Sequence, residues 1–441
     1  MSRGLFSIIT FCASFFCFSL TNAEKLKKPL SLNESITIAI KKSTSIRAAE
    51  HGIKGADYER KVAGTDFLPK LTTEYNYTRF NEDPHMKDRS YTSYPLDVKM
   101  GRKDRYQWNT YLTQPIFTGG ALTSSYQIAK LGLDMAKKNW SKAKQDIVLQ
   151  VKEAYFTILK VEKIKEVALQ AVDQVKSHVD VAQAFFEEEM IPKNDLLEAQ
   201  VRYAQVKQDL IRADNGVQIA KAYFNTVLRQ DVNELVEVED ILVYRPEVFS
   251  LEDCLKEALE RRPEMREANL NLERAQKGVR LAKSRFFPHI SVVTNYQRMG
   301  EHADLRGNPY EDAENWMVST LFSWDVWEWG KKNYQVSAKR AKAAQAEELE
   351  KQVGDIIALE VKESHLNLKE AEQNIFVAES AREQAEENFR LNQERYNEQM
   401  ATTTDVLDAQ TLLTEAQNNY YNALSDYHIA KARLERAIGK E

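Results

Sequence analysis

The sequence predicts a membrane protein of mixed α/β class, in which very long α-helices and pairs of β-strands alternate along two internal repeats. Three observations lead to this fold class. A shift of the chain against itself by 210 positions superimposes Met190 on Met400 and Asp195 on Asp405 without a gap. Apolar residues recur with helical spacing over stretches far longer than a globular helix. Four shorter segments alternate polar residues with apolar or aromatic ones, as β-strands do.

Residues 1–23 have the features of a secretory signal peptide. Arg3 supplies a basic start, residues 5–20 are apolar and uncharged, and Ala23 ends a small-residue cleavage motif. Two of the three cysteines fall in this segment, so the exported chain retains only Cys254 and has no internal disulfide. The formal net charge of −5 argues against a nucleic-acid-binding protein. We therefore expect an exported protein that is stabilised by packing.

The first repeat is predicted to occupy residues 24–230. Its first helix starts at a capping box after Ser31 and ends before Pro69. Residues 81–104 contain two prolines and many charges, which indicates a polar loop inside the strand pair. At about 1.5 Å per residue, the longest helix would span on the order of 100 Å. The predicted elements are a helix (32–66), a β-hairpin (70–115), a long helix (120–187), a tip and a returning helix (195–229).

The second repeat is predicted at residues 251–441, after a linker at 231–250. A shift of 219 positions aligns Phe67 with Phe286 and Pro69 with Pro288, so the order of elements recurs. The predicted elements are a helix from position 251, a β-hairpin (289–325), a long helix (330–397), a tip and a returning helix (405–438).

Each repeat reverses direction at a short, helix-poor tip. Pro192 does not fit the interior of a helix, and Asn194 or Thr404 is expected to cap the returning helix. Asp195 and Asp405 follow at once, so each tip has a carboxylate at the start of a helix. Carboxylates are favourable there whatever their function, by about 0.3–1 kcal/mol.

The strand segments have one apolar or aromatic face and one polar face. Such segments of about ten residues are typical of transmembrane β-strands. The smallest known barrels use about eight strands, so a chain with four closes a barrel only together with other copies. The apolar-face positions include Leu71, Tyr75, Tyr77, Tyr106, Trp108, Leu112, Ile290, Val292, Tyr296, Trp316, Val318, Phe322 and Trp324.

The order of elements and several junction motifs resemble the TolC-like outer-membrane efflux family, the outer-membrane factors of tripartite efflux and type I secretion systems. The motifs are Phe67-Leu-Pro69, Phe286-Phe-Pro288, the Pro-Ile-Phe-Thr-Gly-Gly turn at 115–120 and the segment 404–409. The resemblance implies a homotrimer in which twelve strands form a transmembrane β-barrel and long helices continue as a coiled-coil α-barrel. It places the chain in the outer membrane of a Gram-negative bacterium, with a long periplasmic portion.

The same resemblance implies partners and site residues. The partners are outer-membrane lipid, a periplasmic adaptor (a membrane fusion protein) and an inner-membrane transporter. The pore entrance would be a ring of Asp405 and Asp408, with Asp195 as a gate partner. Two departures stand out, because Ala401 replaces the family's arginine and Glu189 and Gln399 replace tip glycines. The tip residues that would contact the adaptor are Met190, Ile191, Met400 and Ala401.

Other function classes receive less support from the sequence. A periplasmic coiled-coil adaptor or scaffold without a pore is the main alternative, but it would carry one hairpin rather than two. No nucleophile–base pair, carboxylate dyad or phosphate loop suggests an enzyme. The histidines have no ligand spacing, so we expect neither a metal nor a cofactor. Efflux of drugs or metals and type I protein secretion both remain open.

Overall fold

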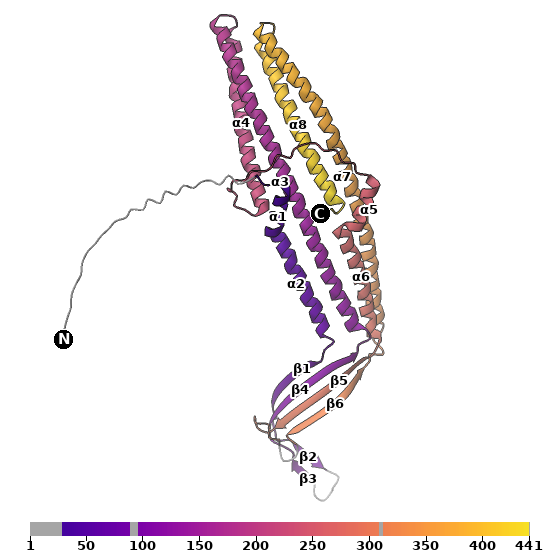
Figure 1. Ribbon diagram of the computed structural model, residues 1–441. Coiled ribbons are helices and arrows are strands. Elements are labelled where there is room, and N and C mark those ends of the chain that lie inside the picture. Colours follow the sequence, from indigo (N-terminus) through magenta and orange to yellow (C-terminus); the bar gives the residue numbers. More distant parts are fainter. Residues whose placement is uncertain (1–28, 89–95, 308–311, 441) are drawn as a thin grey trace, which may run out of the picture.

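The computed structural model describes residues 29–88, 96–307 and 312–440; the expected signal peptide at 1–23 lies outside these residues. The molecule is elongated, with bundled helices over most of its length and a curved β-sheet at one end (Figure 1). The helices are α1 (Leu32–Lys42), α2 (Thr44–Thr65), α3 (Ala121–Glu187), α4 (Lys193–Leu228), α5 (Leu251–Arg261), α6 (Pro263–Lys283), α7 (Lys331–Asn397) and α8 (Thr403–Ala437), with a 3-10 turn at Ser284–Phe286.

The single helix predicted over 32–66 is wrong, because the chain divides it into α1 and α2 at Ser43. The backbone of Ser43 leaves the helical region (ψ 130°), and its hydroxyl accepts the Ile46 N–H at 3.3 Å to begin α2. The second repeat breaks at the corresponding position, Arg262, between α5 and α6. There Pro263 disfavours a helical conformation for the residue before it.

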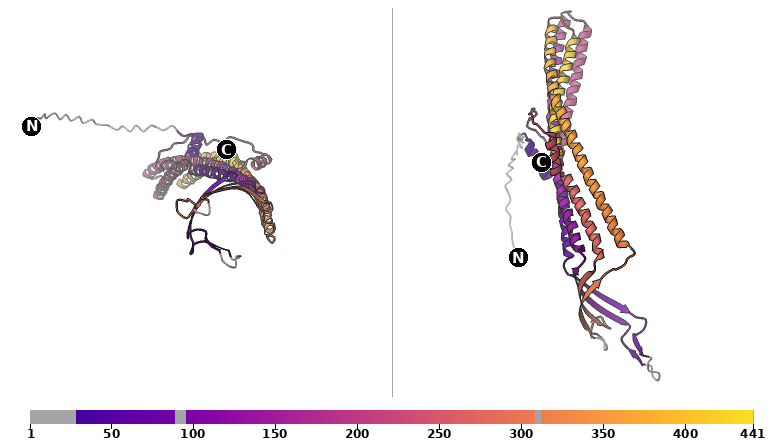
Figure 2. Two further views of the ribbon diagram at one scale, coloured as in Figure 1. Left: turned by 90° about the horizontal axis from the view of Figure 1, so that it is seen from below. Right: turned by 90° about the vertical axis from the view of Figure 1, so that its right-hand side faces the viewer.

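The long helices α3 and α7 have 67 residues each and begin one residue after the predicted starts. They follow Gly120 and Gly330, whose φ angles of 82° and 81° suit glycine. α2, α3, α6 and α7 lie side by side as a curved wall, which is an arc when viewed along the molecule (Figure 2). α4 packs on α3 and α8 packs on α7, forming two antiparallel hairpins that also contact each other.

None of the described helices contains a stretch long and apolar enough to cross a membrane. The main apolar core lies at mid-length, where α1, α5 and the linker 231–250 cover the long helices. Tyr155 is fully buried there, and its hydroxyl lies 3.0 and 2.8 Å from the carbonyl oxygens of Leu30 and Glu239. These contacts hold the linker on the convex side of the wall (Figure 2).

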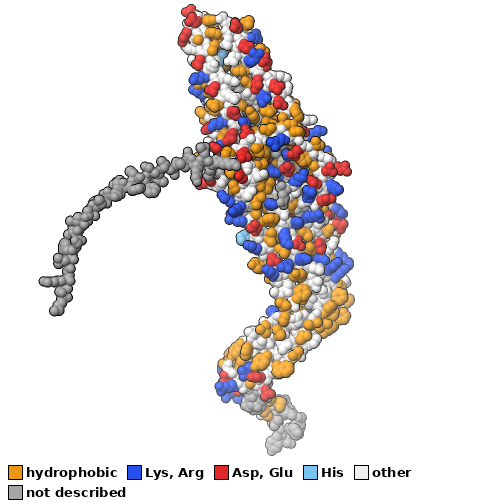
Figure 3. Space-filling view, in the orientation of Figure 1, with side chains coloured by type: hydrophobic (Ala, Val, Ile, Leu, Met, Phe, Trp, Pro, Cys, Tyr) orange, Lys and Arg blue, Asp and Glu red, His pale blue; other side chains and the backbone are white. Residues whose placement is uncertain are grey.

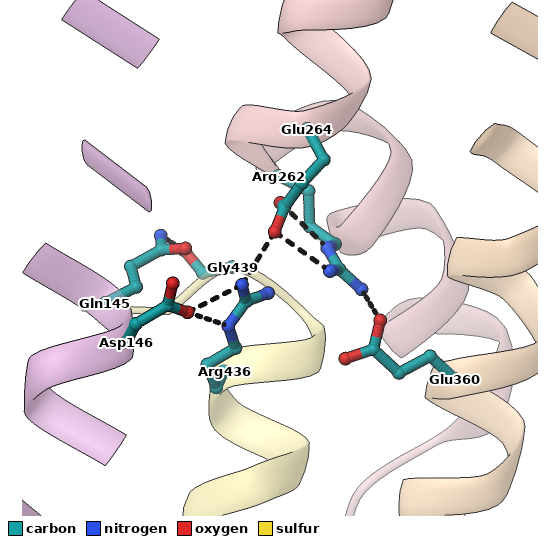
Figure 4. A network of polar contacts seen from close by, with 7 residues as sticks. All are labelled: Gln145, Asp146, Arg262, Glu264, Glu360, Arg436 and Gly439. Carbon is teal, nitrogen blue, oxygen red and sulfur yellow. Dashed lines mark hydrogen bonds and ion pairs between the residues drawn. The ribbon is translucent and has the colours of Figure 1, made fainter. Parts of the chain in front are cut away.

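A largely buried ionic network joins four helices near the end of α8 (Figure 4). Arg436 donates to Asp146 of α3 at 2.8 Å and to Glu264 of α6 at 2.6 Å. Glu264 also pairs with Arg262 at 3.2 Å, and Arg262 reaches Glu360 of α7. Burial raises the pKa of Glu264, but hydrogen bonds from both arginines outweigh this and lower the pKa to about 2. We call these five residues the belt network.

The main sheet is antiparallel, with the order β1–β4–β5–β6. Its register places the predicted apolar positions on one face: Tyr75 lies opposite Trp108, and Tyr296 lies opposite Trp316. β1 and β6 form the two edges, and nearly all of their residues are exposed. The strands are β1 (Lys70–Arg79), β4 (Asp104–Phe117), β5 (His289–Gly300) and β6 (Glu314–Ser323).

The polar stretch predicted as a loop at 81–104 contains a second, two-stranded sheet. β2 (His85–Asp88) pairs with β3 (Leu96–Lys99) in antiparallel register. His85 contacts Asp97 at 2.6 Å. Charged side chains thus pair between the two strands, which explains how a polar sequence forms strands here.

Candidate functional site at the helical tips

Both hairpins turn through the same backbone motif. Glu189 (φ 59°) and Gln399 (φ 60°) adopt the left-handed conformation directly after α3 and α7. The next N–H groups, of Met190 and Met400, bond back to carbonyl oxygens five residues earlier at 2.8 and 2.7 Å. This helix ending favours glycine, so each tip places a residue with a side chain in a strained position.

The helices that return from the tips begin differently. α4 follows Pro192, which offers no side-chain cap. α8 follows Thr402, whose hydroxyl accepts the Asp405 N–H at 3.2 Å while the Asp405 carboxylate accepts the Thr402 N–H at 2.8 Å. The predicted caps Asn194 and Thr404 are wrong, because both residues lie inside the first turn of their helices.

Asp405 and Asp408 lie one turn apart on α8, and both are exposed. The backbone N–H of Thr402, with help from its hydroxyl, lowers the pKa of Asp405 below the ordinary 3.8. Asp405 is therefore an ionised carboxylate that is fixed in place by the helix start. The role of this pair at a pore entrance stays a prediction.

Asp195 occupies the corresponding place in the first turn of α4 and is half-buried. Its charge acts on Tyr396 of α7, in the second hairpin. Burial raises the pKa of Tyr396, and the charge of Asp195 acts in the same direction. Tyr396 is 3% exposed, and its hydroxyl lies 3.2 Å from that of Thr403. The three side chains connect the two tips through one buried phenol.

Two further side-chain pairs join the tips directly, and neither pair was predicted from the sequence. The Thr404 hydroxyl donates to the Glu198 carboxylate, whose oxygens are 3.2 and 3.3 Å away. One turn further from the tip, Arg202 donates to the Thr411 hydroxyl at 2.5 Å. The shift of 210 positions maps Glu198 onto Asp408, so the repeat itself contains the signal for a fourth carboxylate.

The tips also present apolar side chains. Met190 and Met400 are 46% and 64% exposed, which is unusual for large apolar residues at two equivalent positions. Ile191 and Ala401 are partly buried and pack against small clusters beneath the turns. Of the four predicted adaptor-contacting residues, the two methionines are therefore the accessible ones.

Beneath the second tip, α3 and α7 meet through aromatic side chains. His178 packs against Tyr396 with ring centroids 4.6 Å apart and ring planes tilted by 55°, and the Phe185 ring centroid lies 5.6 Å from that of Tyr396. His178 is 5% exposed, and its Nε2 atom has no hydrogen-bond partner among the described residues. Burial lowers the pKa of His178 to about 4, so the ring is neutral near pH 7.

The part of the chain that the structure describes brings no three His, Cys, Asp or Glu side chains together as a metal ion would require. Cys254 is buried in α5 as a free thiol. Asp195, Glu198, Asp405 and Asp408 are the carboxylates near the two helical tips.

The chain is 22% identical over 434 residues to the outer membrane protein TolC of Escherichia coli (strain K12), covering 96% of this chain and 83% of TolC. It is 21% identical over 346 residues to the cobalt-zinc-cadmium resistance protein CzcC of Cupriavidus metallidurans, covering 78% and 79%. The solved structure of the outer membrane protein VceC of Vibrio cholerae has the same fold, with a TM-score of 0.78 at 18% identity over 93% and 96% of the two chains. The outer membrane efflux protein family matches residues 36–228 and 254–440. The chain is therefore a TolC-like member of the outer membrane efflux protein family, located in the outer membrane of a Gram-negative cell with its long helices in the periplasm.

Proposed function

We propose that three copies of this chain form a channel through the outer membrane that serves as the exit duct of an efflux or secretion system. The observation that carries the proposal is the sheet with two open edges. β1 and β6 expose unpaired backbone groups, which is unfavourable unless another strand pairs with them. Pairing β6 of one copy with β1 of the next closes a barrel of twelve strands when three copies join.

The two faces of the sheet support this arrangement. One face carries Tyr75, Trp108 and Trp316, whereas the opposite face carries Asn109 and Asn295, which are 3% and 8% exposed. Apolar side chains toward lipid and polar ones toward the interior are typical of outer-membrane barrels. The curved wall of α2, α3, α6 and α7 would continue the tube into the periplasm.

At the periplasmic end, the exposed carboxylates would surround the entrance. Three copies of Asp405 and Asp408 give six carboxylates, with Asp195 and Glu198 close by in each copy. Crowded carboxylates attract cations, so we expect the entrance to select cations and to be blocked by polyvalent ones.

The tips would also form the gate and the docking surface. In place of an ion pair from the missing arginine at Ala401, the bonds Glu198–Thr404 and Arg202–Thr411 hold the two hairpins together. Breaking these bonds would let the two hairpins separate and would widen the entrance. Asp195 would be a further residue of this gate. Met190 and Met400, supported by Ile191 and Ala401, would contact a periplasmic adaptor linked to an inner-membrane transporter.

Single-channel conductance tests the proposal. The mature protein should give cation-selective current that polyvalent cations block, and Asp405→Asn/Asp408→Asn should lose the block. The matched control, Asp173→Asn/Asp180→Asn, removes two exposed carboxylates of α3 away from the tip and should keep it. Unchanged block in the first variant would refute the aspartate ring but not the channel. A protein that stays soluble and monomeric would refute the channel.

A further inference from the structure

The junction between sheet and helices carries an uneven distribution of charge. In the second repeat, residues 274–289 and 324–346 contain ten Lys or Arg and two Asp or Glu. The equivalent residues of the first repeat, 55–70 and 114–136, contain four of each. Because both junctions have the same backbone plan, the fold itself does not require the excess of positive charge.

Seven of the ten cations are exposed and form no ion pair with a carboxylate among the described residues. We call them the cationic collar. Figure 3 shows Lys and Arg side chains over the ends of α6 and α7, directly next to the apolar surface of the sheet. The view in Figure 3 is onto the convex face of the helical wall, on which the linker lies (Figures 1 and 2). The collar consists of Arg274, Arg280, Lys283, Arg285, Lys339, Arg340 and Lys342.

Helix dipoles do not account for the collar. Cations are favourable near the C-terminus of a helix, which suits Arg280 and Lys283 at the end of α6. Lys339, Arg340 and Lys342, however, lie beyond the first turn of α7 and far from its C-terminus, where the helix dipole has little effect. The first turn of α7 contains no acidic residue. The helix dipole therefore does not explain why these three cations are placed there.

A neighbouring copy of the chain is a poor source of that partner. In the proposed trimer, α7 lies beside α2 of the next copy. α2 contains four Lys or Arg and three Asp or Glu. One of its carboxylates, Asp57, is already paired with Arg60 and Lys61 at 2.8 Å. This surface is close to neutral and does not complement the collar.

The aromatic residues at the same level indicate where the membrane ends. Trp327 and Trp329 are 73% and 86% exposed and stand between β6 and α7 with ring centroids 5.9 Å apart. Exposed tryptophans of this kind are typical of membrane–water interfaces. Phe286 and Phe287 are exposed at the corresponding end of α6. The collar begins immediately on the helical side of these residues.

Distances along the helices place the collar within reach of lipid headgroups. Arg340 lies nine residues from the start of α7, which is about 14 Å at 1.5 Å per residue. A headgroup layer is about 5–8 Å thick on each side, and charges act over a further length of about 8 Å at physiological salt. The collar thus falls within the layer where phosphates and their potential are found.

We propose that the cationic collar, next to Trp327 and Trp329, binds the phosphates of anionic phospholipids in the periplasmic leaflet of the outer membrane. The proposal rests on the proposed barrel, because only a membrane-inserted sheet brings the collar to that leaflet. The second repeat would supply most of the contact, so anionic lipid would gather at three places around a trimer.

The test compares lipid enrichment around the protein in phosphatidylcholine vesicles that contain some phosphatidylglycerol, extracted as native discs and analysed for headgroups. Lipid extracted with the parent protein should be enriched in phosphatidylglycerol by about fivefold or more, which is the factor that one interfacial Lys or Arg contributes. High salt should remove this enrichment. The collar variant should lose most of it. That variant is Arg280→Gln, Lys283→Gln, Arg340→Gln and Lys342→Gln.

Two further variants separate binding from folding and from total charge. Arg280→Lys/Arg340→Lys retains the charges and should retain the enrichment. A control that removes four exposed lysines nearer the tips should also retain it. That control is Lys176→Gln, Lys207→Gln, Lys362→Gln and Lys369→Gln.

Several outcomes would overturn the proposal. Equal enrichment in the parent and the collar variant, or equal loss in the control, would show that the collar is not the binding surface. Altered ion selectivity without loss of lipid would place these cations in the lumen. Collar-dependent binding to isolated peptidoglycan, without lipid enrichment, would assign the surface to the cell wall instead. A parent that does not float with phosphatidylcholine vesicles would refute the barrel itself, and the collar with it.

Discussion

The helices are joined in two places, and the chemistry of the two joints is opposite. At mid-length, the belt network holds them through two largely buried arginines; Arg262 and Arg436 are 5% and 11% exposed, and each pairs with two carboxylates. At the tips, an exposed hydrogen bond from the Thr404 hydroxyl to Glu198 and a part-buried one from Arg202 to the Thr411 hydroxyl join the two hairpins. Both joints connect the first repeat to the second.

The difference predicts which joint yields first. Removing one partner from a buried ionic network costs about 3–5 kcal/mol, because a charge stays behind in a poorly solvated place. Losing one of the hydrogen bonds at the tips, each of which has one charged partner, costs about 1.5–3 kcal/mol. The hydrogen bonds at the tips should therefore break before the belt network does, as the proposed gate requires.

The largest expected effect follows Arg436→Met. We expect a loss of about 3–5 kcal/mol in the free energy of unfolding, because Glu264 and Asp146 lose their shared cation. The matched control is Arg390→Met: Arg390 also pairs with two carboxylates, at 2.6 Å each, but is 53% exposed. The control should lose about 1 kcal/mol or less. Urea unfolding followed by circular dichroism measures both, and equal losses would remove the distinction between belt and tip.

The stability that the belt network contributes should also fall at acid pH. The folded-state pKa of Glu264 is about 2, below its ordinary 4.5, so its contribution is complete above pH 4.5 and declines as the pH falls toward 2.

The next largest effect is the pH dependence of stability that arises from His178, which packs against Tyr396 beneath the tips. The pKa of His178 is lowered from 6.5 to about 4, so protons bind the unfolded state preferentially as the pH falls through this range. We expect a loss of up to about 3 kcal/mol by pH 4. Hydrogen exchange of residues 175–200 should accelerate over this range, and His178→Phe should abolish the acceleration. His428, whose pKa is also lowered, acts at mid-length and serves as the internal comparison.

A smaller effect is expected from Thr402→Ala. The change removes the cap of α8 and should cost about 1 kcal/mol, with faster hydrogen exchange in residues 403–410. Thr404→Ala, two residues away, leaves the cap intact and should affect mainly the bond to Glu198. If Thr404→Ala frayed the helix start as much as Thr402→Ala, the assignment of the cap would be wrong.

The smallest expected effects are increases in the free energy of unfolding. Glu189→Gly and Gln399→Gly relieve the left-handed conformation at the tips, and each should add about 0.5–1 kcal/mol. Glu188→Gly, one residue earlier at a negative φ of −88°, should give no gain. Thermal unfolding distinguishes these variants.

The sequence predicted the long helices, the tips and the strand faces because each is encoded by many residues in period. Prediction from the sequence failed where a single contact determines the local structure. Three consecutive threonines precede Asp405, and any of them could cap the helix. The sequence does not reveal that the Asp405 carboxylate bonds to Thr402, which makes Thr402 the cap instead of Thr404. The break at Ser43 has no proline beside it, and its signal lies in the other repeat, at Pro263. Glu198 was missed because its partner, Thr404, becomes a neighbour only when the hairpins pack.

The open edges of the sheet have a consequence for biogenesis. A single exported copy presents β1 and β6 as two complementary, unsatisfied edges, and such edges join to any extended strand of suitable register. Head-to-tail joining ends in a ring only if the rotation per copy closes; otherwise it continues as a filament. In the proposed trimer, the curvature of the helical wall would set that rotation, so the helices would also determine the number of subunits and keep newly made subunits from polymerising.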